Sequence, residues 1–126
     1  MTNLLLAAAI LMLLTGVAHS VLGELLILRH MSKFQAVPPL LGSIELTKRT
    51  LRFTWHLATL LASGMALILV HYAYLPQLGD GEKFVVHTIG GAMLACSVVT
   101  LAVSRGKHPG WVAFLVIAVL SWLGAR

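Results

Sequence analysis

The sequence predicts an all-α polytopic membrane protein, an antiparallel bundle of four transmembrane helices with both termini on the extracytoplasmic side. Three observations predict it: an apolar composition, four apolar runs of membrane-spanning length, and cations concentrated in the connections on one side. Of the 126 residues, 59% are hydrophobic and 10% are charged, and the mean hydropathy is +0.93. A soluble domain carries roughly 45–50% apolar and about 25% charged residues. This chain therefore has too little polar surface to cover a globule in water.

Four apolar runs lie along the chain, and a helix needs about 20 such residues to cross the hydrocarbon core. The expected spans are residues 4–28, 51–74, 84–104 and 109–125, all within a single domain over residues 1–126. The fourth run is the shortest and reaches across only if it stands nearly upright. Unpaired backbone is too costly to face lipid, and no period-2 strand pattern is present. The spans are therefore predicted to be helices.

The connections between the runs contain residues that begin and end helices. Ser43 is predicted to cap a helix that starts before the second span. Asp80 or Gly81 is predicted to cap the third helix. Gly106 and Pro109 separate the third run from the fourth, with glycine after one helix and proline at the start of the next. Because all three connections are short, neighbouring helices are expected to be antiparallel.

The charges indicate an orientation in the membrane. The net charge is +5, and seven of the nine cations flank the first and third connections: Arg29, Lys33, Lys48, Arg49, Arg52, Arg105 and Lys107. The positive-inside rule places these connections in the cytoplasm, so we expect a multi-pass protein of the bacterial inner (plasma) membrane. The basic belt is expected to contact anionic lipid headgroups. A nucleic-acid interface is excluded because the cations do not share one face with interleaved aromatics.

The lone cysteine, Cys96, leaves no partner for an intrachain disulfide or for a CxxC redox or zinc pair. Because it lies among small residues in the middle of the third span, we expect it to be a packing residue.

One half of the first span is built from small and polar residues, and leucines fill the other half. These residues are Ala8, Met12, Thr15, Gly16, His19, Ser20, Gly23 and Glu24. Small residues allow neighbouring helices in a membrane to approach closely. Gly16, Ser20 and Gly23 are therefore predicted to form a helix contact.

Ionisable residues within spans are costly, and each indicates a candidate site. In the second span a polar stripe recurs at helical spacing: Lys48, Arg52, Trp55, His56, Thr59 and Ser63. At 1.5 Å rise per residue, its inner end lies at the depth of Glu24 and His19. We expect a structural ion pair between Glu24 and Arg52, with His19 and His56 hydrogen-bonded to Ser20, Thr59 or backbone groups.

An alternative interpretation of the same residues is a cofactor site. His19 and His56 are then ligands to a haem iron or a transition metal, with Glu24 as a third metal ligand. Against it, His19 and Glu24 are five residues apart, which is about 140° around an α-helix. His71 and His87 extend this interpretation to a two-haem conduit. The cofactor therefore stays open: haem or a transition metal is possible but not expected by default.

The segment His19-Ser20-Val21-Leu22-Gly23-Glu24 and the pair Trp55-His56 resemble short four-span bacterial inner-membrane proteins without an assigned function. The resemblance covers mainly the first two helices and implies no activity. It implies that His19, Glu24 and His56 are the positions most worth testing.

No catalytic residues are predicted, and whether the chain is an enzyme stays open, with the balance against it. We expect an accessory or interaction subunit of a larger inner-membrane assembly, which contacts lipid and either other membrane subunits or further copies of itself. The alternative is a haem-binding or metal-binding redox protein that uses His19 and His56. A small transporter through the Glu24 region is less favoured, because four short helices require an oligomer to enclose an aqueous path.

Overall fold

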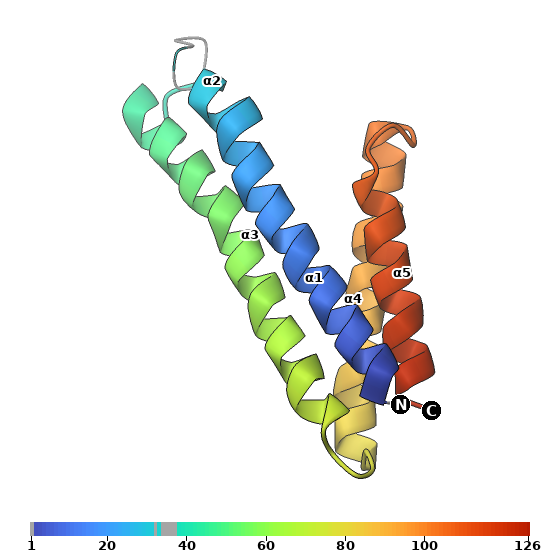
Figure 1. The fold of residues 1–126 in the computed structure, drawn as a ribbon. Helices are drawn as coiled ribbons and strands as arrows, with labels where there is room; N and C mark the ends of the chain where they lie inside the picture. Colours follow the sequence, from blue (N-terminus) through green and yellow to red (C-terminus); the bar gives the residue numbers. More distant parts are fainter. Residues whose placement is uncertain (1, 32, 34–37) are drawn as a thin grey trace. The chain divides into compact units, whose positions relative to one another are not determined.

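The computed structural model describes residues 2–31, 33 and 38–126, and within them the secondary structure is helical (Figure 1). The first helical segment consists of α1 (Thr2–Leu22), a π-helix η1 (Gly23–Leu28) and α2 (Arg29–Met31). It is followed by α3 (Ile44–Ala73), α4 (Asp80–Ser104) and α5 (Gly110–Gly124). The predicted all-α class is confirmed. The chain forms two units, Gly16–Ala62 and Met1–Thr15 with Ser63–Arg126, which we describe separately.

Three helical segments are long and apolar enough to cross a membrane: Asn3–Met31, Ile44–Ala73 and Asp80–Ser104. The fourth, α5, has 15 residues and is about 22 Å long at 1.5 Å per residue. The hydrocarbon core is about 30 Å thick. The lengths therefore support membrane association through three helices, and a crossing by α5 stays a prediction.

The sequence predicts a uniform α-helix for the first segment, but the structure contains a π-helical turn there. Over Gly23–Leu28 the backbone is π-helical, and the N–H of Arg29 donates to the carbonyl of Glu24, five residues earlier. A π-turn accommodates one more residue than an α-turn and so changes which side chains share a face. Residues five apart, which diverge in an α-helix, are brought closer together here.

The helix ends agree with the predictions in part. The N–H of Leu46 donates to Ser43 Oγ at 3.2 Å, which confirms Ser43 as the cap of α3. The cap predicted at Asp80 or Gly81 is wrong, because Gly79 is the extended residue before α4 and its carbonyl accepts the N–H of Lys83 at 3.0 Å. Asp80 is instead the first helical residue, where its charge faces the positive end of the helix dipole.

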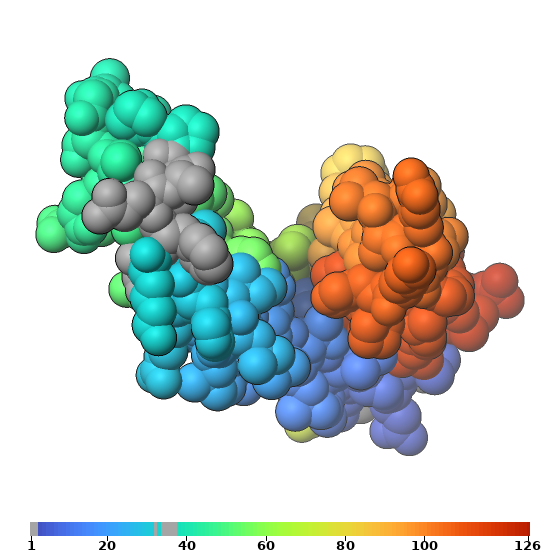
Figure 2. Space-filling view, turned by 90° about the horizontal axis from the view of Figure 1, so that it is seen from above, coloured from blue at the N-terminus to red at the C-terminus, as the bar shows by residue number. Residues whose placement is uncertain are grey.

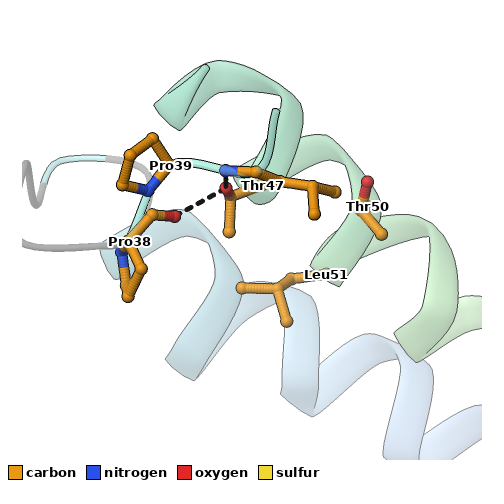
Figure 3. Close-up of a pocket in the computed structure, with 6 residues that line it drawn as sticks. Pro38, Pro39, Thr47, Thr50 and Leu51 are labelled. Carbon is orange, nitrogen blue, oxygen red and sulfur yellow. Dashed lines mark hydrogen bonds between the residues drawn. The ribbon is translucent and has the colours of Figure 1, made fainter. Parts of the chain in front are cut away.

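Before α3 the chain folds back on the helix that it precedes (Figure 3). Thr47 Oγ1 donates to the carbonyl of Pro38 at 2.7 Å and accepts the N–H of Leu40 at 2.8 Å. Leu41 and Gly42 both have positive φ, 47° and 80°, which is uncommon for a leucine. The two hydrogen bonds of Thr47 hold the chain just before this turn. The same turn lines a shallow apolar groove formed by Pro38, Pro39, Leu40, Thr47, Thr50 and Leu51.

In the unit formed by Met1–Thr15 and Ser63–Arg126, aliphatic side chains from four helices form the core: Leu5, Ala8, Ala9, Met12, Ala66, Leu69, Ala73, Val86, Ile89, Met93, Ile117 and Ala118. Helices α4 and α5 form a hairpin, whose orange connection is seen end on in Figure 2. Ser97 Oγ donates to the carbonyl of Trp111 at 2.7 Å across this hairpin. Cys96, predicted to be a packing residue, is exposed, because the buried face of α4 passes through Met93 and Ser97 instead.

Candidate functional site

Small residues of the first helical segment lie against α3 in the unit Gly16–Ala62. Gly16 and Gly23 are both buried. A Cβ atom added at Gly16 would lie 3.4 Å from Thr59 Cγ2, and one added at Gly23 would overlap the indole ring of Trp55. Thr59 Oγ1 also donates to the carbonyl of Gly16 at 3.2 Å. The glycines therefore let polar and aromatic side chains of α3 reach the backbone of α1, as small residues do at membrane helix contacts.

Trp55 is held by His19 in two ways. Its Nε1–H donates to the backbone carbonyl of His19 at 3.0 Å, and the two rings are stacked with their centroids 4.6 Å apart and an angle of 4° between their planes. A carbonyl oxygen has two lone pairs and can accept a bond beyond the one within its helix. Thus the imidazole of His19 packs as an aromatic surface for Trp55.

Ser20, His56 and Glu24 form a chain of polar contacts between the two helices. Ser20 Oγ and His56 Nδ1 are hydrogen-bonded at 2.5 Å, and His56 Nε2 lies 3.4 Å from Glu24 Oε2. A proton on Nε2 would face the carboxylate and leave Nδ1 to accept the hydroxyl of Ser20. Glu24 Oε2 is buried and receives no hydrogen bond from the described residues. The imidazole is therefore its nearest electrostatic partner in the described ion pairs.

The other carboxylate oxygen of Glu24 faces two guanidinium groups. Arg52 Nη2 lies 3.1 Å from Oε1, and Arg29 Nε lies 3.9 Å from the same atom. The side chain of Glu24 is 26% exposed, against 48% for Arg52 and 64% for Arg29. The first helical segment and α3, joined by the contacts of Trp55, His56 and Thr59, are called the α1–α3 hairpin below. At its end, one carboxylate that is largely shielded from water meets two positive charges.

The structure brings together four predicted site residues, Glu24, Arg52, His56 and Ser20. It adds Arg29, which was not expected at the site from the sequence. In an α-helix residues five apart diverge by about 140°, so nothing in the sequence pattern placed Arg29 beside Glu24. The π-helix changes that angle. The one signal in the sequence that could have indicated this contact is that Arg29 follows Glu24 closely enough to reach its carboxylate.

The three residues predicted as metal ligands are used differently. His19 stacks on Trp55, whereas His56 contacts Ser20 and Glu24. Within residues 2–31, 33 and 38–126, no three His, Cys, Asp or Glu side chains are grouped so that they could hold a metal ion. Glu24 is instead surrounded by cations, which disfavours a further positive ion. Haem or metal binding by His19 and His56 stays an untested alternative.

His71 and His87, the histidines of the possible two-haem conduit, have local contacts. His71 lies beside Tyr72 with ring centroids 5.7 Å apart. His87 Nδ1 contacts the carbonyl of Lys83 at 2.7 Å. Both contacts are with residues on the same helix, and a two-haem conduit through these histidines stays an untested alternative.

Comparisons of the chain with protein families, curated proteins and solved structures find no match. The chemistry of the site and the exposed surface of the helices are therefore the basis for a function.

Proposed function

We propose that the chain is a small integral membrane protein that acts as an accessory or interaction subunit of a larger assembly in the bacterial inner membrane. The observation that carries the proposal is a stripe of small residues on the exposed face of α4. Thr88, Ala92 and Cys96 are all exposed, and their spacing of four places them along one side of the helix.

Small side chains are suited to a helix partner. Association of helices in a membrane relies on close packing, and small residues four apart let two backbones approach. The hydroxyl of Thr88 donates to the carbonyl of Phe84 at 2.8 Å, so the stripe presents little unsatisfied polarity. Other exposed positions on α4 include the small Ala95 and Ala102 and larger side chains such as Val98 and Val103, which are 57% and 82% exposed. We assign the stripe to a partner helix and the larger aliphatic positions to lipid.

The α1–α3 hairpin supplies a fixed scaffold in this proposal. Its polar contacts join the two helices through side chains and backbone. These contacts would keep the two helices in register while α4 binds a partner. A role for His19 and His56 in redox chemistry is not included, because Trp55 and Ser20 already engage their rings.

The natural position of Cys96 allows a direct test. A photoactivatable maleimide on Cys96, in membranes from cells that express the full chain, should produce a discrete protein adduct. The matched control carries Cys96→Ser and Val98→Cys, which moves the probe by about 200° around α4 and should yield lipid adducts alone. Ala92→Leu should remove the protein adduct from Cys96 and leave the amount of folded protein unchanged.

Each outcome separates the alternatives. An adduct with another membrane protein supports a subunit role, and an adduct with twice the mass of the chain replaces it with a homo-oligomer. Equal lipid labelling from both positions, with no protein adduct, contradicts the proposal.

A further inference from the structure

We infer that Arg29 and Arg52 bind the phosphate of an anionic phospholipid at the end of the α1–α3 hairpin. The first observation is their convergence: Arg29 Nε and Arg52 Nη2 both point to Glu24 Oε1, at 3.9 Å and 3.1 Å. Two guanidinium groups beside one carboxylate leave one positive charge in excess. That excess lies where the carboxylate is mostly shielded from water.

The convergence is built into the backbone. The π-turn brings Arg29 toward Glu24, whose carbonyl accepts the N–H of Arg29. Arg52 comes from the other helix and reaches the same oxygen. The carboxylate therefore orients two cations that belong to different helices, which an ordinary pair within one helix cannot do.

The donor geometry fits a phosphate. A guanidinium group has five N–H donors in a planar fork, and the 3.1 Å contact of Arg52 Nη2 with Glu24 uses only part of that fork. Arginine recognises phosphate through two parallel hydrogen bonds, which a lysine cannot form. The side chains of Arg29 and Arg52 are 64% and 48% exposed, so both forks reach the surface of the hairpin.

The depth of the site selects a lipid as the source of this phosphate. Arg52 lies 21 residues before the end of α3 at Ala73, a distance of about 31 Å at 1.5 Å per residue. The hydrocarbon core is about 30 Å thick. If the Ala73 end is at one boundary of this core, Arg52 is at the other, at the level of the headgroups. Trp55 lies one turn deeper, where aromatic residues gather in membrane proteins.

A second ion pair on α3 provides a matched control. Arg49 Nε is 3.0 Å from Glu45 Oε1, so one cation here meets one carboxylate on the same helix, without excess charge from a neighbouring helix. Both groups are well exposed, at 77% and 64%. The site requires α1 and α3 to lie in a membrane, and it is independent of the proposed contact at α4.

The test uses the purified full chain in a mild detergent, with native mass spectrometry to count retained lipids and intrinsic tryptophan fluorescence to follow the Tm. Phosphatidylglycerol is added to one sample and phosphatidylcholine with the same acyl chains to another. Wild type and Arg49→Gln should retain phosphatidylglycerol and rise in Tm. Arg29→Gln and Arg52→Lys should bind it about tenfold more weakly, as expected for the loss of one charge-assisted hydrogen bond.

Arg52→Lys retains the positive charge beside Glu24 and so guards against simple misfolding. Equal retention of phosphatidylglycerol by Arg49→Gln, Arg29→Gln and Arg52→Lys would overturn the inference, as would equal stabilisation of wild type by phosphatidylcholine. Inorganic phosphate alone should not raise the Tm. If it does so to the same extent as the lipid, the ligand is free phosphate and the lipid assignment is wrong.

Discussion

The indole N–H of Trp55 donates to the backbone carbonyl of His19 across the α1–α3 hairpin, at 3.0 Å. The α4–α5 hairpin contains the same relationship, because Trp122 Nε1 donates to the carbonyl of His87 at 3.2 Å. In each case a glycine lies under the indole ring, Gly23 for Trp55 and Gly90 for Trp122. Each hairpin is thus joined by a tryptophan that bonds to one helix carbonyl and packs on a glycine near it.

This common contact predicts that removal of the indole donor weakens both hairpins. Trp55→Phe and Trp122→Phe keep an aromatic ring but lose the N–H. Each should lower the free energy of unfolding by about 1 kcal/mol, the net value of a hydrogen bond, on top of the effect of a smaller ring. Unfolding by SDS in mixed micelles measures the free energy of unfolding of each variant. Restored stability in Trp55→Phe at elevated lipid content would indicate that lipid packing, not the hydrogen bond, controls the contact.

The glycine under Trp55 should not tolerate even a methyl group. Gly23→Ala places a Cβ inside the indole ring, and overpacking of this kind costs about 1–3 kcal/mol. Gly64→Ala is the matched control, because an added Cβ there meets nothing within 4 Å. It should be neutral or stabilising by up to about 1 kcal/mol, since alanine favours a helix. Equal destabilisation by both changes would mean that the contact at Gly23 is not formed.

Glu24 and Arg52 should behave as a coupled pair. In a double-mutant cycle, Glu24→Gln and Arg52→Gln should be less damaging together than the sum of the single effects. Because the pair is partly exposed, we expect a coupling of about 0.5–1 kcal/mol. The cycle of Glu24→Gln with Arg49→Gln should show none, since Arg49 pairs with Glu45. Full additivity for Glu24 and Arg52 would show that they do not interact in the membrane.

The imidazole contacts predict that His19 and His56 do not hold a cofactor. We expect the purified protein to show no Soret band and less than stoichiometric metal by elemental analysis. His56→Gln should reduce stability through its contacts with Ser20 and Glu24 without a change in the absorption spectrum. A chromophore that is present in wild type and lost in both His19→Ala and His56→Gln would make this cluster a cofactor site.

The sequence was informative about features that depend on the length of an apolar run, on a capping residue or on opposite charges at the same depth. Run lengths and hydropathy predicted the helices, and Ser43 predicted the start of α3, because a serine in that position bonds to the backbone two or three residues later. Depth and opposite charge were sufficient to expect Glu24 near Arg52, which the structure places 3.1 Å apart.

The sequence was uninformative where the outcome depended on backbone detail. The π-turn at Gly23–Leu28 leaves no mark in an apolar run, and without it Arg29 is on the wrong side of the helix. The cap of α4 was misplaced because Gly79 and Asp80 are both suitable residues, and the choice depends on which of them is extended. The stacking of His19 on Trp55 depends on two rotamers, which residue spacing does not specify.

We predict that the chain crosses the bacterial inner membrane with the Glu24 end of the α1–α3 hairpin at the cytoplasmic face. Cysteine accessibility in intact cells measures this orientation. In a Cys96→Ser background, Asp80→Cys should react with an impermeant maleimide from outside, whereas Lys33→Cys should react only after the cells are opened. Labelling of Lys33→Cys from outside, with Asp80→Cys protected, would show that the hairpin has the opposite orientation.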